Sequence, residues 1–118
     1  MPDSLEILRQ QLAEFASKRD WDQFHSPKNL SMALIAEAAE LVEHFQWLTD
    51  EESRQLNDDK KSAVSHELAD ILIYLIRTAD KLGIDLIKSA HDKIMINESR
   101  YPVEKSRGQA KRASEYEK

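Results

Sequence analysis

Hydrophobic side chains recur every three or four residues along most of this chain, a spacing that places them on one face of an α-helix. We expect long helices over roughly residues 4–19, 27–48, 59–82 and 86–100, with a short surface helix starting after Thr49. The chain has only two glycines and three prolines, and all three prolines lie where a helix could start or stop. The pattern therefore predicts an all-α fold.

Capping residues set the expected boundaries. Ser26–Pro27 is typical of an N-cap followed by the first helical residue. Asp3–Glu6 and Thr49–Glu52 resemble capping boxes, in which the first and fourth residues satisfy each other's backbone N–H groups. Gly83 suits the position just after a helix, and Asp85 suits the N-cap of the next one.

The third long helix carries an apolar run over residues 71–76. A run of this kind could also be a buried strand, but the helical pattern continues on both sides without a breaker. A helix that is apolar on all sides needs cover on all sides, which one small four-helix domain cannot readily supply. We therefore expect self-association through this helix.

The composition is that of one globular domain. The chain has 118 residues, of which 41% are hydrophobic and 33% charged, enough for one modest core. We expect the domain to cover residues 1–102, followed by a polar, disordered tail over residues 103–118.

Charge and cysteine content exclude several classes. A net charge of −5 argues against binding to a nucleic-acid polymer through its phosphates. The chain has no cysteine, which excludes disulfides and thiolate metal sites. We find no signal peptide and no apolar run of membrane-spanning length, and expect a cytoplasmic protein without a membrane partner.

Two pairs of carboxylates interrupt the apolar faces of the second and third long helices. Glu37 and Glu40 are three residues apart, as are Glu67 and Asp70, so each pair projects from one side of its helix. We find no Lys or Arg on these stripes to compensate the charges. If both faces turn to one core, four carboxylates meet there and need protons or cations.

This cluster has three interpretations. The residues could be ordinary surface charges of a non-catalytic helical interaction module. They could bind hard divalent cations, Mg²⁺ first and Mn²⁺ as an alternative, which prefer oxygen ligands. A carboxylate-bridged di-iron site is less consistent, because no Glu-x-x-His motif occurs in the chain. We favour the metal site and assign all four carboxylates to it.

The chain resembles the MazG-like all-α nucleotide pyrophosphohydrolases, and most closely their dCTP pyrophosphatase branch. The two carboxylate pairs match the metal signature of that family. Four ordered blocks carry the resemblance, namely Arg19–His25, Ala39–Trp47, Glu67–Tyr74 and Lys93–Pro102. Ala36 stands where many members have a further Glu, which leaves the number of metal ions open.

The resemblance implies a four-helix MazG-like bundle that assembles as a dimer of dimers. It also implies Mg²⁺-dependent hydrolysis of a nucleoside triphosphate between its α- and β-phosphates. The leading substrate is dCTP or a modified dCTP, converted to the monophosphate and pyrophosphate, which would clean or balance the nucleotide pool. Glu37, Glu40, Glu67 and Asp70 would be the catalytic metal-binding carboxylates.

Basic and aromatic residues complete the expected site. Lys93, Asn97 and Arg100 share one face of the fourth helix. The spacing by itself is typical of a helix end exposed to solvent. The resemblance to the family, however, implies that these three side chains contact phosphate. Flat rings can stack on a base, although aromatics at helix ends are more often core residues. The residues expected to contact the substrate in this way are Trp21, Phe24, His25, Trp47 and Tyr74.

Overall fold

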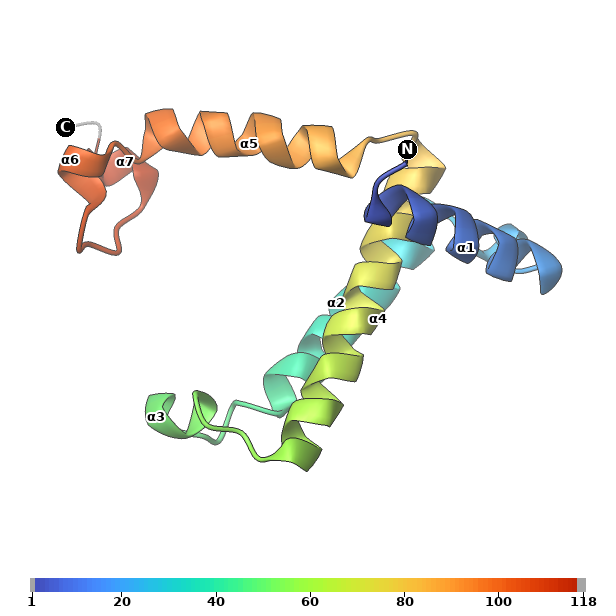
Figure 1. Cartoon of the computed structure of the whole chain (residues 1–118), viewed down its shortest axis with the longest axis horizontal. Coiled ribbons are helices and arrows are strands. Elements are labelled where there is room, and N and C mark those ends of the chain that lie inside the picture. Colours follow the sequence, from blue (N-terminus) through green and yellow to red (C-terminus); the bar gives the residue numbers. More distant parts are fainter. Residues whose placement is uncertain (1, 117–118) are drawn as a thin grey trace. The chain divides into compact units, whose positions relative to one another are not determined.

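A computed structural model of the chain describes residues 2–116, and all the regular structure in that range is helical, which confirms the all-α prediction (Figure 1). The elements are α1 (Ser4–Lys18), the 3-10 turn η1 (Asp22–Phe24), α2 (Pro27–Glu43), α3 (Asp50–Ser53), α4 (Asp58–Leu82), α5 (Leu86–Arg100), α6 (Val103–Ser106) and α7 (Ala113–Tyr116). They form two compact units, Met1–Ile84 and Asp85–Lys118. Among residues 2–116, no helix combines the length and apolarity needed to cross a membrane.

The first unit is built on the long helix α4. Helix α2 packs along α4, and α1 packs against α4 as well (Figure 1). Leu30 of α2 is buried in this unit together with Val64, Ile76 and Ala79 of α4. Burying such side chains supplies most of the free energy that holds the helices together.

The predicted caps form and fix where the helices begin. Ser26 Oγ accepts a hydrogen bond from the Asn29 N–H at 3.1 Å, ahead of Pro27. At Thr49 both hydrogen bonds of a capping box with Glu52 are present. At Asp3 only one of them forms, because the Glu6 carboxylate binds Arg9 instead.

Helix α2 ends at Glu43, five residues before the predicted end at residue 48. The N–H groups of His44 and Phe45 bond to carbonyls three residues back, at 3.2 and 2.9 Å, so the last turn tightens. The chain can then turn into the Thr49 cap. Trp47 lies in this turn and is 87% exposed.

The apolar run of α4 is only partly covered. Within residues 71–76, Ile76 is buried, whereas Leu72 is 39% exposed and Leu75 42%; Leu68, which precedes the run by one turn, is 52% exposed. These three leucines are spaced i, i+4 and i+7 and therefore form one uncovered stripe. Leu72 and Leu75 belong to the run from which we expected self-association, and Leu68 extends their exposed surface.

The second unit contains α5, α6 and α7. Residues 103–116, which we expected to be disordered, include the two short helices α6 and α7. The buried ring of Tyr116 packs edge-on against that of Tyr101, with 5.7 Å between the ring centres. The Tyr116 hydroxyl accepts a hydrogen bond from the Lys111 N–H. Residues 117–118 of the expected tail lie outside the described residues, and a domain boundary at residue 102 stays a prediction.

Replacing Leu30 by Ala should lower the free energy of unfolding by about 2–5 kcal/mol, because Leu30 is only 2% exposed and its removal leaves a cavity between α2 and its neighbours. Urea denaturation followed by circular dichroism measures the change. Lys28→Ala, at an exposed position in the first turn of the same helix, is the control and should change stability by less than about 0.5 kcal/mol. Equal effects of the two variants would contradict this packing.

Candidate functional site

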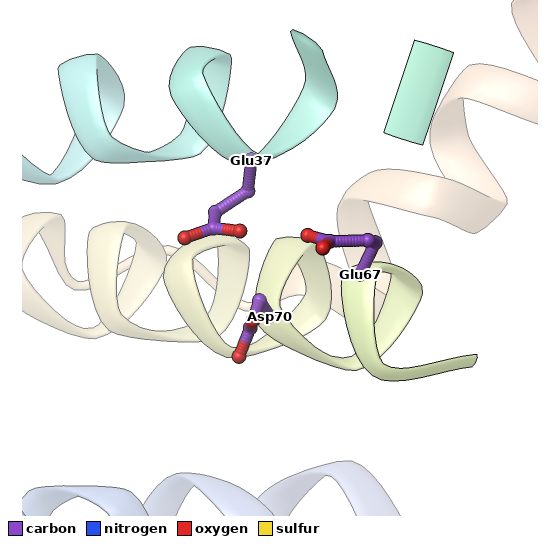
Figure 2. A group of neighbouring side chains, drawn as sticks. All are labelled: Glu37, Glu67 and Asp70. Carbon is purple, nitrogen blue, oxygen red and sulfur yellow. The ribbon is translucent and has the colours of Figure 1, made fainter. Parts of the chain in front are cut away.

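Three carboxylates from two helices converge in the first unit. Glu37 reaches from α2 toward α4, where Glu67 and Asp70 lie one turn apart (Figure 2). One oxygen from each of the three lies within 4.8 Å of the others, and all three residues are half-buried. The α2–α4 packing thus brings together members of both predicted pairs.

The arrangement leaves oxygen atoms without partners. Glu37 Oε2 and Glu67 Oε2 are buried and receive no hydrogen bond from the described residues. The neighbouring Glu67 carboxylate, assisted by burial and by the Glu40 and Asp70 carboxylates, raises the pKa of Glu37 from 4.5 to about 7. Near neutral pH these carboxylates therefore need a shared proton or a cation. An all-oxygen group of this kind fits a hard divalent cation.

Two neighbours extend the acidic group. Glu40 is exposed and lies outside the three converging residues, yet it stands close enough to Glu37 to contribute to its raised pKa. A metal-binding role for Glu40 stays a prediction. His44 Nε2 lies 3.9 Å from Glu67 Oε1, so a protonated His44 would form an ion pair with this carboxylate.

The structure corrects one sequence interpretation. We found no basic residue on the carboxylate stripes, but Arg77 follows Asp70 by seven residues on the same side of α4 and is only 3% exposed. Its guanidinium binds Asp22 at 2.9 Å and Asp80 at 3.3 Å. The spacing of seven residues from Asp70 could have indicated that Arg77 lies on this side of the helix. It did not indicate that the charge of Arg77 is paired with Asp22 and Asp80.

The predicted aromatic residues occupy different environments. Trp21 packs edge-on against Phe15 at 5.7 Å, and its ring centre lies 6.3 Å from that of His25. Phe24, in η1, is 60% exposed. Tyr74 is half-buried and lies between Asp70 and Arg77 along α4.

The predicted phosphate ligands lie in the second unit. Lys93, Asn97 and Arg100 are all part of α5 at the expected spacing. Asn97 is half-buried, and the other two are exposed. Their contact with a substrate stays a prediction.

Comparison with known proteins identifies the family. A profile described as the MazG-like family matches residues 33–116, which include all three converging carboxylates. The chain belongs to the MazG-like family. A crystal structure of a pyrophosphatase from Archaeoglobus fulgidus superposes on this MazG-like chain with a TM-score of 0.81 and 37% identity, covering 86% of this chain and 95% of that one.

Curated relatives of this MazG-like chain carry the name dCTP pyrophosphatase 1. The Bos taurus protein is 46% identical over 109 residues, which cover 91% of this chain and 64% of the relative. The Homo sapiens protein is 41% identical over 114 residues, which cover 95% of this chain and 67% of the relative. The chain thus spans about two thirds of the length of these relatives.

The raised pKa of Glu37 makes the stability of the metal-free chain depend on pH. The folded chain holds this proton more tightly than the unfolded chain, so the stabilisation is complete below the ordinary pKa of 4.5 and is lost as the pH rises through about 7. In the presence of a metal chelator, the free energy of unfolding of the wild type should therefore fall relative to that of Glu37→Gln as the pH rises from about 5 to about 8.

Urea unfolding at several pH values measures this difference. Glu14→Gln, which removes an exposed carboxylate paired with Lys18 on α1, should follow the wild-type pH profile. If Glu37→Gln had the same profile as wild type, the carboxylates would not interact in solution.

Proposed function

We propose that this chain hydrolyses dCTP, or a closely related deoxynucleoside triphosphate, to the monophosphate and pyrophosphate with Mg²⁺ as cofactor and Mn²⁺ as an alternative. The main support for the proposal is the convergence of Glu37, Glu67 and Asp70, two of which, Glu37 and Glu67, have a buried oxygen without a hydrogen-bond partner. Relatives named dCTP pyrophosphatase 1 support both the reaction and the base. Such an activity would keep the nucleotide pool balanced.

The chemistry assigns distinct tasks to the residues. Glu37, Glu67 and Asp70, with Glu40 beside them, would hold the cation. When bound, the metal neutralises charge on the phosphates and lowers the pKa of a water molecule. Water attacks the α-phosphorus, the bond from that phosphorus to the bridging oxygen breaks, and pyrophosphate leaves. A carboxylate of the same group accepts the proton of the attacking water.

The remaining predicted residues would bind the nucleotide. The rings that we assign to the base are those of Trp21, Phe24, His25, Trp47 and Tyr74. Lys93, Asn97 and Arg100 would hold phosphate oxygens, Lys93 as a point charge and Arg100 through its planar guanidinium.

Two other functions make different predictions for the same acidic group. A non-catalytic interaction module would bind neither Mg²⁺ nor Mn²⁺ in calorimetry. A carboxylate-bridged di-iron protein would retain iron after purification and show its absorbance. Neither is favoured by the relatives' names.

Incubation with dCTP and Mg²⁺ should release pyrophosphate and dCMP rather than orthophosphate. Glu67→Gln and Asp70→Asn should each lower kcat/KM about 100-fold or more while leaving the circular dichroism spectrum unchanged, because each removes a negative metal ligand but keeps the side-chain volume. Glu14→Gln is the control and should retain wild-type activity. Full activity of both site variants would refute the assignment, and faster turnover of purine nucleotides would refute the base preference.

We also propose that the chain forms a homo-oligomer, a tetramer built as a dimer of dimers, through the exposed stripe of Leu68, Leu72 and Leu75. Size-exclusion chromatography with light scattering should give a mass above the 13.7 kDa of one chain. Leu72→Glu should shift the mass toward the monomer, because a charge in an apolar interface must be desolvated. A monomeric wild type would refute the proposal.

A further inference from the structure

A buried arginine joins three elements of the first unit. Besides Asp22 and Asp80, Arg77 contacts His25, whose Nδ1 lies 3.2 Å from Nη2 and 3.4 Å from Nε. Lys81 Nζ binds the same Asp22 oxygen at 2.9 Å. Arg9 Nη1 of α1 binds the other oxygen of Asp80 at 3.1 Å. The network thus ties α1 and α4 to the connection that carries η1.

The contact with Arg77 determines which nitrogen of His25 carries the proton. A guanidinium has five N–H donors and no acceptor. A ring nitrogen placed 3.2 Å from it is stable only as an acceptor, so Nδ1 is unprotonated. The proton of the neutral imidazole is therefore on Nε2, which is left as a donor.

The surroundings of His25 favour the neutral form of its ring. Burial, Arg77 and Lys81 lower the pKa of His25, and Asp22 opposes them. Asp22 lies 2.9 Å from both Arg77 and Lys81, so most of its charge is already balanced. Protonating Nδ1 would also turn an N–H toward the guanidinium, which the contact disfavours.

The location of His25 indicates what its Nε2–H group could bind. Arg77, which contacts His25, lies seven residues beyond Asp70, or about 10 Å along α4. In a nucleotide whose phosphates lie at the acidic group, the base is the part that reaches such a distance. The Trp21 ring, beside His25, offers a flat surface for that base.

We propose that Arg77 is a positioning residue that fixes His25 as an Nε2–H donor to an acceptor atom of the nucleotide base. This inference rests on the proposed function for the identity of the ligand, whereas the tautomer of His25 rests on the contact alone. A cytosine ring offers a carbonyl oxygen and an unprotonated ring nitrogen as acceptors. A neutral N–H donor can form a hydrogen bond to either of these atoms, and it does not attract anions in general as a charged imidazolium would.

Long-range ¹H–¹⁵N NMR of the labelled protein tests the tautomer without any turnover. In wild type, His25 should be the Nε2–H tautomer and should titrate at a lower pH than in the urea-unfolded chain. In Arg77→Met the two tautomers should mix and the titration should move to higher pH. Arg54→Met, at an exposed position after α3, is the matched control and should leave the His25 signals unchanged.

Kinetics test the role of the donor. Arg77→Met and His25→Phe should each raise KM for dCTP about tenfold, the effect of losing one hydrogen bond, and the double variant should be no worse than either. Inhibition by inorganic triphosphate, which has no base, should be unchanged in both single variants. If the two variants bound inorganic triphosphate more weakly by the same factor as dCTP, the contact would be with the phosphates and the proposal would be overturned.

Further results would contradict the positioning role of Arg77 or the proposed ligand. An Nδ1–H tautomer in wild type, or losses that multiply in the double variant, would overturn the positioning role. If Arg77→Met fails to fold, Asp22→Asn removes one carboxylate that holds the guanidinium, and an unchanged His25 spectrum would again overturn it. If wild type shows the Nε2–H tautomer but does not hydrolyse dCTP, the proposed function fails separately and the base as ligand fails with it.

Discussion

The candidate site depends on the approach of Glu37 to Glu67 across the contact of α2 with α4. Two carboxylates with buried oxygens oppose folding unless a proton or a cation joins them. Leu30 and Val64, buried in the same unit, supply apolar contacts that favour the folded arrangement. The cluster is thus a locally unfavourable arrangement that the rest of the unit maintains, as is common at functional sites.

Helix α4 keeps opposite charges apart along one side. Asp70 lies about two turns and Glu67 nearly three turns before Arg77, and the guanidinium is bound to Asp22 and Asp80 rather than to the acidic group. If Arg77 neutralised Glu67 directly, the carboxylates would have no need of a cation. Because the positive charge of Arg77 is balanced by Asp22 and Asp80, it does not neutralise the acidic group that we propose holds the cation.

Local signals in the sequence were sufficient for the helices and for three converging carboxylates. The caps at Ser26 and Thr49 depend on contacts between residues three apart, which a sequence displays directly. Arg77 and Asp22 are 55 residues apart, so their pairing depends on how the connection that carries η1 packs against α4. For the same reason, the sequence could not show that Glu40 would be more exposed than Glu37.

The uncovered stripe of α4 bears on how association and catalysis can coexist. Leu68, Leu72 and Leu75 lie about 130° around the helix from the side that carries Glu67, Asp70 and Tyr74. A second copy of the chain covering this stripe, as we propose, would bury apolar surface without occupying the acidic side. It would also restrict the movement of α4, which carries two of the three converging carboxylates and Arg77. Association would then stabilise the geometry of the site while leaving it accessible to a nucleotide.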